Sequence, residues 1–354
     1  MSQQPFGQLS NGDDCQLYIL KNTQGTCVSI TNYGGIIIAL SVADNLGNFD
    51  DIVLGYDTVA DYEKDTYYLG AIVGRYAGRI KNGSLIINDK SYQLTLNASN
   101  SHLHGGSKGL NKRCWQTQSL TTDSSATVKL TYVSPDGEEG YPGTVTINVS
   151  YTLSDDNELI VEYRASTDAP TILNLTQHSY FNLAGHDSGT IENHELTINA
   201  DHYLPMSEEV YPTGGIETVT NSPHDFRVKK PLGKEMKSQD SQIIIAKGYD
   251  NYWLLNDSAI NQSAFSAQVT EPSSGRRMTI FTDQPSIILY TANYIDGSHI
   301  GKNNCPYQGQ GALCLEPVRA VTKQHINKIT PVMLLPNLPF YSQTRYLFDT
   351  VARD

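Results

Sequence analysis

The sequence predicts an all-β chain of 354 residues in which antiparallel strands form one large domain, residues 1–354. Apolar and polar residues alternate with period two in many short segments, and Gly, Asn or Asp separates these segments about every ten residues. This pattern is typical of a β-sandwich or a barrel. No window of twelve or more residues has a helical period, and no charge block or low-complexity linker divides the chain.

Residues 144–166 predict the clearest element, a β-hairpin. Val145, Ile147 and Val149 share one face of the first strand, residues 154–157 supply turn chemistry, and the alternation resumes at Leu159. Further strands are predicted in residues 84–96, 127–133, 173–180, 277–282 and 286–294. Residues 58–64 can form at most a turn or two of helix.

Composition excludes several classes of function. The formal net charge of −12 and the pI near 5.1 argue against a nucleic-acid or anionic-membrane partner, because a negative surface repels phosphate. The longest apolar runs, such as residues 34–40, are too short to span a bilayer. The N-terminal segment has neither a basic start nor an apolar stretch, so we expect a cytoplasmic protein.

The cysteines and tyrosines give two further expectations. Five scattered cysteines without a C-x-x-C pair predict buried free thiols and neither a zinc knuckle nor a disulfide framework. The 22 tyrosines outnumber the 8 phenylalanines. Tyrosine suits half-buried sheet surfaces and offers an apolar ring with a hydroxyl tip to a polar ligand.

Two motifs in the first third of the chain carry candidate binding groups. In residues 74–83, Arg75 and Arg79 lie between glycines and could either bind vicinal hydroxyls or brace a turn through backbone carbonyls. In residues 100–106, His102 and His104 alternate and so face the same way on a strand, followed by two glycines that permit close backbone approach. An H-x-H pair is also a metal-ligand spacing, although no clear further ligands accompany it.

Two later motifs carry candidate acid–base groups. Residues 173–180 predict a strand that places Asn174, Thr176 and His178 on one face, a density of polar groups unusual for a core. Glu316 follows the apolar run 313–315 and directly precedes a proline. We expect its carboxyl to be partly desolvated, which raises its pKa and makes it a better base near neutral pH. The alternative is a glutamate that emerges into solvent at a strand end.

Taken in order along the chain, seven short segments resemble the galactose mutarotase (aldose 1-epimerase) family. They are GRYAGRI, NSHLHGG, LNLTQHSYFNLAG, ADHYLP, YDNYWLL, TDQPSIILYTANYIDG and LCLEP, and the resemblance extends from about residue 30 to the C-terminus. The resemblance covers nearly the whole chain and implies one large antiparallel β-sandwich with a sugar-binding cleft on a concave sheet. It also implies interconversion of the α and β anomers of a free aldose such as galactose or glucose, a monosaccharide partner, and no cofactor or metal.

The resemblance also implies roles for individual residues. Glu316 matches the general base and His178 the general acid. The matched substrate ligands are Arg79, His104, Asp250 and Gln284, and Tyr180 and Asn182 fall within the histidine motif as supporting residues. The chain departs from the family pattern at Gly78, where many members have Asn, and after Glu316, where it continues PVRAVTKQH. These departures bear on substrate preference more than on reaction type.

Three other readings of the sequence remain open. A carbohydrate-binding module without catalysis would use the same cleft but would not need a matched acid and base. A metal-dependent cupin-type isomerase would rest on His102 and His104. An epimerase acting on hexose 6-phosphates shares the fold and would need basic residues at the C6 end of the sugar.

Overall fold

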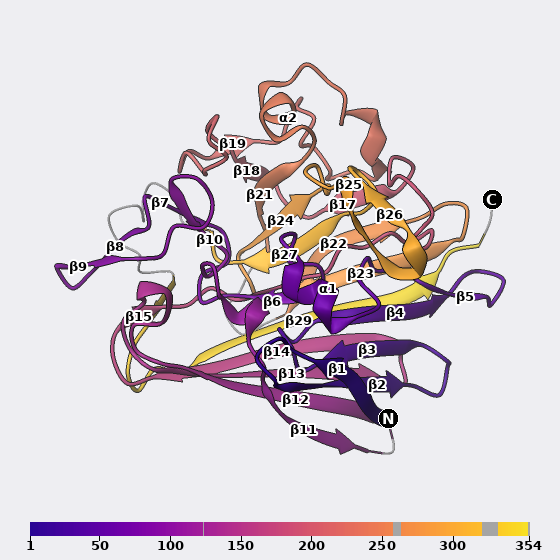
Figure 1. Cartoon of the computed structure of the whole chain (residues 1–354). Helices are drawn as coiled ribbons and strands as arrows, with labels where there is room; N and C mark the ends of the chain where they lie inside the picture. Colours follow the sequence, from indigo (N-terminus) through magenta and orange to yellow (C-terminus); the bar gives the residue numbers. More distant parts are fainter. Residues whose placement is uncertain (123, 258–262, 321–331, 353–354) are drawn as a thin grey trace.

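The computed structural model describes residues 1–122, 124–257, 263–320 and 332–352. These residues form an all-β fold with two short α-helices, α1 (Val59–Lys64) and α2 (Ser241–Ala246), which confirms the predicted fold class (Figure 1). Single 3₁₀ turns lie at Leu110–Lys112, Glu138–Gly140, Leu232–Lys234 and Lys302–Asn304. None of the helices in the described part of the chain has the length and apolar character needed to cross a membrane.

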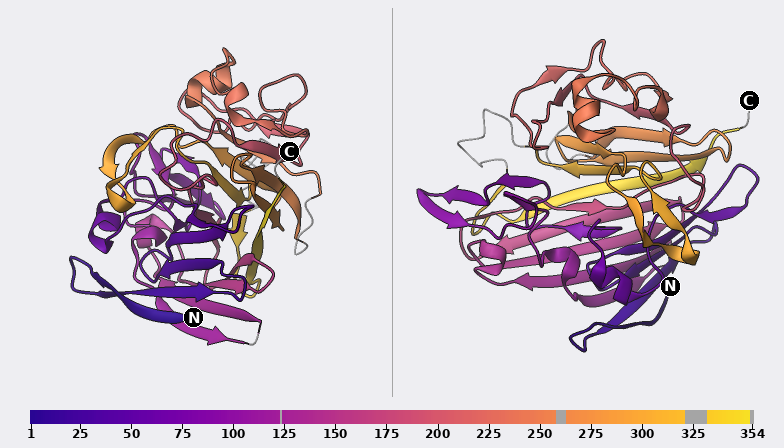
Figure 2. Two further views of the ribbon diagram at one scale, coloured as in Figure 1. Left: turned by 90° about the vertical axis from the view of Figure 1, so that its right-hand side faces the viewer. Right: turned by 45° about the horizontal axis from the view of Figure 1, so that its top comes forward.

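The largest sheet has nine antiparallel strands and carries the predicted hairpin. Its strands, in spatial order, are β11 (Gln116–Thr121), β12 (Ser125–Ser134), β13 (Val145–Ser154), β14 (Glu158–Thr167), β29 (Phe340–Thr350), β23 (Arg276–Thr282), β22 (Ala264–Thr270), β17 (Glu195–Ile198) and β20 (Lys230–Pro231). The hairpin β13–β14 pairs Val149 with Tyr163, and buried residues alternate along both strands. Strand β29, yellow in Figure 2, lies between β14 and β23 and so joins early and late parts of the chain in one sheet.

Two five-stranded antiparallel sheets accompany the large one. The N-terminal sheet contains β1 (Ser2–Gln8), β2 (Asp14–Lys21), β3 (Cys27–Thr31), β4 (Ile37–Ala43) and β5 (Phe49–Asp51). The other sheet has the order β19 (Glu217–Thr218), β18 (His202–Leu204), β21 (Asp250–Leu254), β24 (Ser286–Tyr290) and β27 (Cys314–Val318). One buried apolar cluster, which extends from Tyr18 in β2 to Phe348 in β29, joins all three sheets.

Five short antiparallel pairs complete the fold. They are β7 (Arg79–Lys81) with β10 (Ser101–Leu103), β6 (Ala71–Val73) with β16 (Thr176–His178), β8 (Ser84–Ile87) with β9 (Lys90–Gln93), β25 (Asp296–Ile300) with β26 (Pro306–Gln308), and β15 (Thr171–Ile172) with β28 (Met333–Leu334).

Three strands expected from the sequence differ in the structure. The strand expected over residues 286–294 ends at Tyr290, as β24. Residues 84–96 form a hairpin and not one strand, because Asn88 and Asp89 both adopt the left-handed conformation of a two-residue turn. The strand expected over residues 173–180 is limited to β16, Thr176–His178.

Candidate active site

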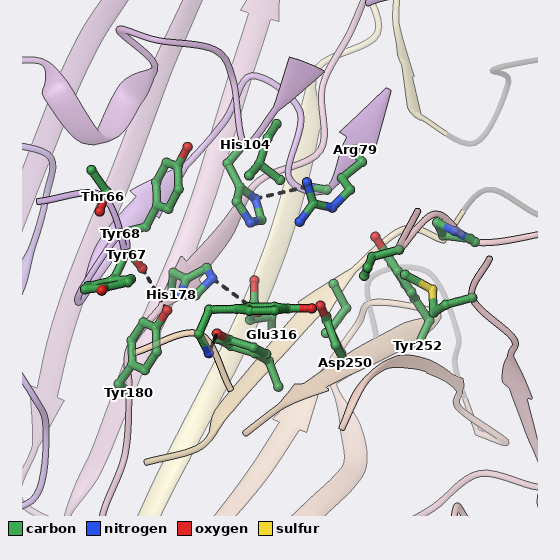
Figure 3. Close-up of a pocket in the computed structure, with 18 residues that line it drawn as sticks. Thr66, Tyr67, Tyr68, Arg79, His104, His178, Tyr180, Asp250, Tyr252 and Glu316 are labelled. Carbon is green, nitrogen blue, oxygen red and sulfur yellow. Dashed lines mark hydrogen bonds and ion pairs between the residues drawn. The ribbon is translucent and has the colours of Figure 1, made fainter. Parts of the chain in front are cut away.

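One wall of a cleft in the fold is a single face of the sheet β21–β24–β27. Tyr252 lies opposite Ile288, and Ile288 lies opposite Glu316. Asp250 lies opposite Tyr290, two residues farther along the same two strands. Because side chains alternate along a strand, all five residues point to the same face. They line a pocket with a volume of about 230 Å³ (Figure 3).

The opposite wall consists of turns and the ends of short strands. Its main side chains come from Tyr68, Arg79, His104 and His178 (Figure 3). Tyr68 and His104 have positive φ angles of 60° and 51°. Both residues line the pocket from this left-handed backbone conformation, which residues other than glycine adopt only rarely.

The glycines of this wall are required by close backbone approach. A Cβ on Gly105 would lie 1.7 Å from the carbonyl oxygen of Gly74, so no larger residue fits. Gly78 has a φ of 107°, and a Cβ there would lie 2.7 Å from the hydroxyl of Tyr252. The space that a side chain at position 78 would fill is therefore occupied by a tyrosine hydroxyl from the other wall.

His178 and Glu316 meet at the bottom of the pocket. The Nε2 atom of His178 lies 3.5 Å from Oε1 of Glu316, and both residues are almost completely buried, with 4% and 2% exposure. The rings of Tyr68, His104 and Tyr180 surround the imidazole, with centroids 6.1, 5.3 and 5.1 Å from its own. The second carboxylate oxygen of Glu316, Oε2, has no hydrogen-bond partner among the described residues.

Burial moves the pKa values of this pair in opposite directions. Desolvation, followed by the negative charge of Asp250, raises the pKa of Glu316 well above its ordinary value. Desolvation lowers the pKa of His178 to about 4. Desolvation therefore favours the neutral form of both groups. The predicted rise in the pKa of Glu316 is confirmed, and the alternative of a solvent-exposed glutamate is wrong.

His104 is held as a neutral hydrogen-bond donor. The backbone N–H of Gly78 donates to its Nδ1 over 3.2 Å, so the ring proton resides on Nε2. Burial, together with the neighbouring His178 and Arg79, lowers the pKa of His104 well below its ordinary value. The Nε2–H group can therefore donate to a ligand at neutral pH.

Asp250 and Arg79 supply opposite charges to the pocket. Burial raises the pKa of Asp250 to about 6, and Arg79 acts in the other direction. Asp250 is therefore ionised near neutral pH and can accept hydrogen bonds from hydroxyl groups. Both residues line the pocket, as the sequence predicts for substrate ligands.

Three polar residues predicted near the site do not line this pocket among the described residues. Gln284 is not among the described residues that line the pocket; its amide donates to Asp283 and to Ser342. Asn174 donates to the carbonyl oxygen of Ala77 and accepts from the backbone N–H of Arg319, so it joins the segment before β7 to the segment after β27. Thr176 is buried outside the pocket. The polar face of residues 173–180 thus contributes only His178 and Tyr180 to the site.

Of the two arginines in residues 74–83, and of the two histidines in residues 100–106, one lines the pocket and the other does not. Arg75 is buried and donates to the carbonyl oxygens of Ser134, Pro135 and Pro142, which confirms the turn-bracing alternative. The ring nitrogens of His102 contact the carbonyl oxygen of Thr95 and the hydroxyl of Tyr141. The expectation that His102 and His104 face the same way is wrong, because β10 ends at Leu103 and the backbone turns at His104.

Apart from Tyr180, sequence reasoning missed the tyrosines of the pocket. Tyr252 lies two residues after Asp250 on β21, and Tyr290 lies opposite Asp250 on β24. The period of two along these strands was a usable signal for both residues. No such signal exists for Tyr68, whose position depends on its positive φ.

Comparisons with known proteins point to one family. A sequence profile of the family described as aldose 1-epimerase matches residues 16–347. Galactose mutarotase from Mus musculus is 39% identical over 345 residues, 97% of both chains, and that from Homo sapiens is 37% identical over 344 residues, again 97% of both. The crystal structure of a galactose 1-epimerase from Lactobacillus acidophilus superposes with a TM-score of 0.88 at 28% identity and covers 99% of both chains.

Proposed function

The chain belongs to the aldose 1-epimerase family and is an aldose 1-epimerase, an isomerase, and we propose that its reaction depends on one proton shared between Glu316 and His178. The observation that carries this proposal is the buried pair itself, with Nε2 and Oε1 3.5 Å apart at the bottom of the pocket. The substrate is a free monosaccharide. We propose galactose as the first sugar to test, because the similar mammalian relatives are named galactose mutarotases.

The reaction needs one proton acceptor and one proton donor. Ring opening removes the proton of the C1 hydroxyl and delivers a proton to the ring oxygen. Glu316 accepts the first proton and His178 donates the second. The aldehyde then rotates about the C1–C2 bond, and reclosure reverses both transfers to give the other anomer.

The buried pair can exist in two states with the same number of protons. In one state the carboxyl group and the imidazole are both neutral; in the other the carboxylate faces an imidazolium. The second state matches the cyclic sugar, and the first is the state left when the sugar is open. Desolvation favours the neutral state in the empty pocket, so hydroxyl groups of the bound sugar must stabilise the ionised state.

The remaining polar groups hold the sugar against this pair. Arg79 and the Nε2–H of His104 donate hydrogen bonds from one wall, and Asp250 accepts hydrogen bonds at the other. The tyrosine rings exclude water, which strengthens each of these interactions and fixes the reacting atoms in place.

The charges of the pocket favour a free sugar over a sugar phosphate. Among the described lining residues, Arg79 is the only lysine or arginine, whereas Asp250 and Glu316 are both acidic. A dianionic phosphate would meet two carboxyl groups and one cation. The matched acid and base likewise favour an enzyme over a carbohydrate-binding module.

Three broader expectations complete the proposal. Residues 1–354 form one domain, supported by the apolar cluster that joins all three large sheets. The five free cysteines suit a reducing compartment, in agreement with a cytoplasmic location. The net charge of −12 disfavours nucleic-acid partners.

The variant Glu316→Gln tests the proposal most simply. It preserves the shape of the side chain and removes its basicity, so kcat for α-galactose mutarotation, followed by polarimetry, should fall about 10²–10⁴-fold. Sugar binding should be largely retained. Glu192→Gln, which changes a glutamate paired with Lys237 outside the pocket, is the matched control and should keep full activity. A Glu316→Gln enzyme with near wild-type turnover would show that this mechanism does not operate.

A further inference from the structure

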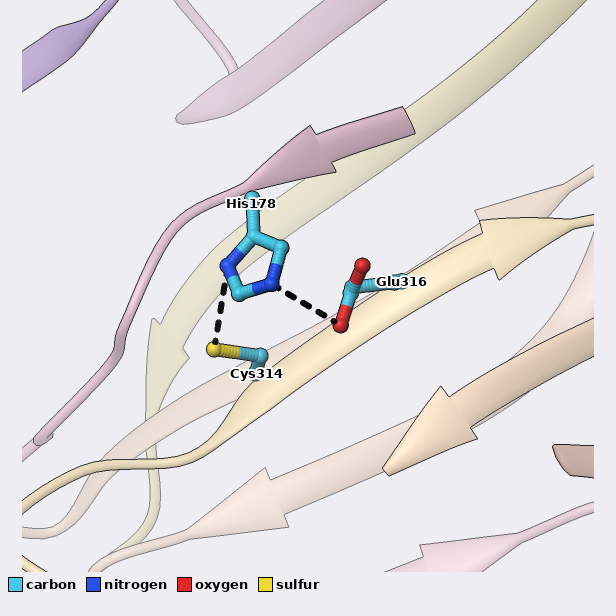
Figure 4. A group of neighbouring side chains, drawn as sticks. All are labelled: His178, Cys314 and Glu316. Carbon is cyan, nitrogen blue, oxygen red and sulfur yellow. Dashed lines mark hydrogen bonds and ion pairs between the residues drawn. The ribbon is translucent and has the colours of Figure 1, made fainter. Parts of the chain in front are cut away.

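The proton-transfer pair has a third neighbour that the reaction does not use. Cys314 lies two residues before Glu316 on β27, so both side chains point to the same face. Its Sγ lies 3.6 Å from Nδ1 of His178, while Nε2 of the same ring faces Glu316 (Figure 4). The thiol is completely buried and is not among the described residues that line the pocket.

The three side chains together offer a nitrogen, a sulfur and an oxygen donor. One donor atom from each residue can be chosen so that all three lie within 4.8 Å of one another. Tetrahedral zinc, with bonds of about 2.0–2.3 Å, spaces its ligands roughly 3.3–3.8 Å apart, so the donors must approach one another by up to about 1 Å. Because Sγ lies against Nδ1 and Glu316 lies against Nε2, the imidazole must also turn so that one of its nitrogens faces both partners. The unpartnered Oε2 atom of Glu316 leaves this carboxylate free to rotate toward an ion.

We propose that His178, Cys314 and Glu316 form an inhibitory binding site for a borderline-soft divalent cation such as Zn²⁺. The ion displaces the proton of the thiol and the proton of the carboxyl group to solvent, while the imidazole binds in its neutral form. One divalent cation with one thiolate and one carboxylate is electrically neutral, which suits a buried site. The fourth coordination position faces the pocket and takes water.

The donor set determines which ions bind. Thiolate and imidazole suit Zn²⁺ and Co²⁺, whereas Mg²⁺ and Ca²⁺ require oxygen ligands. The inhibitory consequence rests on the proposed function, because the ion occupies the two groups assigned to proton transfer. The binding itself does not depend on that assignment.

Cobalt titration tests the binding without using activity. Adding Co²⁺ to the purified protein should produce the near-ultraviolet thiolate-to-cobalt charge-transfer absorption of a tetrahedral site, and excess Zn²⁺ should remove it. Cys314→Ser should abolish this absorption. Cys305→Ser, which changes a half-buried thiol outside the cluster, should leave it intact. Cys314→Ala is the second variant, and thermal unfolding verifies that both Cys314 variants are folded.

Mutarotation in the presence of Zn²⁺ tests the consequence. Zn²⁺ should inhibit the wild-type enzyme, Mg²⁺ should not, and a chelator or excess galactose should restore the rate. The concentration of Zn²⁺ that halves the rate should rise at least about tenfold in Cys314→Ser, with each variant compared with its own metal-free rate.

Two results would overturn the inference. Equal cobalt absorption in wild type and Cys314→Ser would place the thiolate ligand elsewhere. A Cys314-dependent absorption without any inhibition by Zn²⁺ would contradict the inhibitory role. If instead Glu316→Gln retained activity while the Cys314-dependent absorption persisted, the proposed function would fail and the metal site would stand.

Discussion

The pocket wall formed by β21, β24 and β27 differs from the opposite wall, formed by residues 66–68, 78–79 and 103–104, in how the backbone directs its side chains. On the first wall, regular antiparallel pairing places Asp250, Tyr252 and Glu316 on one face. On the second wall, positive φ angles turn Tyr68 and His104 inward. The regular wall places the carboxyl of Glu316 through strand register, while the irregular wall supplies donors whose direction depends on single backbone conformations.

The largest expected difference in KM comes from alanine substitution of one charged residue on each wall, Asp250 on the regular wall and Arg79 on the irregular wall. In the proposed site, Asp250→Ala and Arg79→Ala each remove a charge-assisted hydrogen bond to the sugar, which contributes about 1.5–3 kcal/mol. KM should therefore rise about 10- to 150-fold in each variant, with kcat much less affected, as measured by initial mutarotation rates. An unchanged KM in Asp250→Ala would contradict its role as a sugar ligand.

The pH profile of kcat/KM separates the binding carboxylate from the catalytic pair. Asp250, whose pKa is about 6, loses its charge as the pH falls through that value, so kcat/KM should decline there, approaching tenfold per pH unit. A second decline should follow near pH 4, where His178 takes up a proton and the pair holds one proton too many. The decline near pH 6 should be absent in Asp250→Asn.

On the alkaline side the shared proton gives a clear expectation. The pair loses its proton only above the raised pKa of Glu316. A loss of activity centred on the ordinary histidine pKa of about 6.5 would show that His178 titrates alone.

Tyr252→Phe should change KM least. It tests the place where the two walls of the pocket contact each other, between Tyr252 and Gly78. The hydroxyl of Tyr252 occupies the space beside Gly78 and has no hydrogen-bond partner among the described residues. A neutral hydrogen bond to the sugar contributes about 0.5–1.5 kcal/mol, so KM should rise about 2- to 12-fold. The ratio of galactose to glucose turnover should change as well, because Tyr252 lines the pocket in which we propose the sugar binds. An identical ratio and KM would show that the hydroxyl does not touch substrate.

The regular wall could be predicted from sequence and the irregular wall only in part. Period-two alternation predicts the strands, and a carboxyl after an apolar strand predicts a raised pKa, as Glu316 confirms. Period-two alternation gave a wrong result for His102 and His104. The left-handed backbone at His104 changes the direction of its side chain. Family resemblance placed Arg79, Asp250 and His178 in the pocket but also suggested Gln284, whose amide is occupied by Asp283 and Ser342.

A double-mutant cycle tests the central claim, that Glu316 and His178 act as one proton-sharing unit, most directly. Mutarotation of α-galactose is followed by polarimetry at low buffer concentration for wild type, Glu316→Gln, His178→Asn and the double variant. Each single substitution should lower kcat about 10²–10⁴-fold, and the double variant should lie within about tenfold of the slower single variant. A double variant slower by the full product of the two single effects would show that the two residues act independently, which contradicts the shared proton.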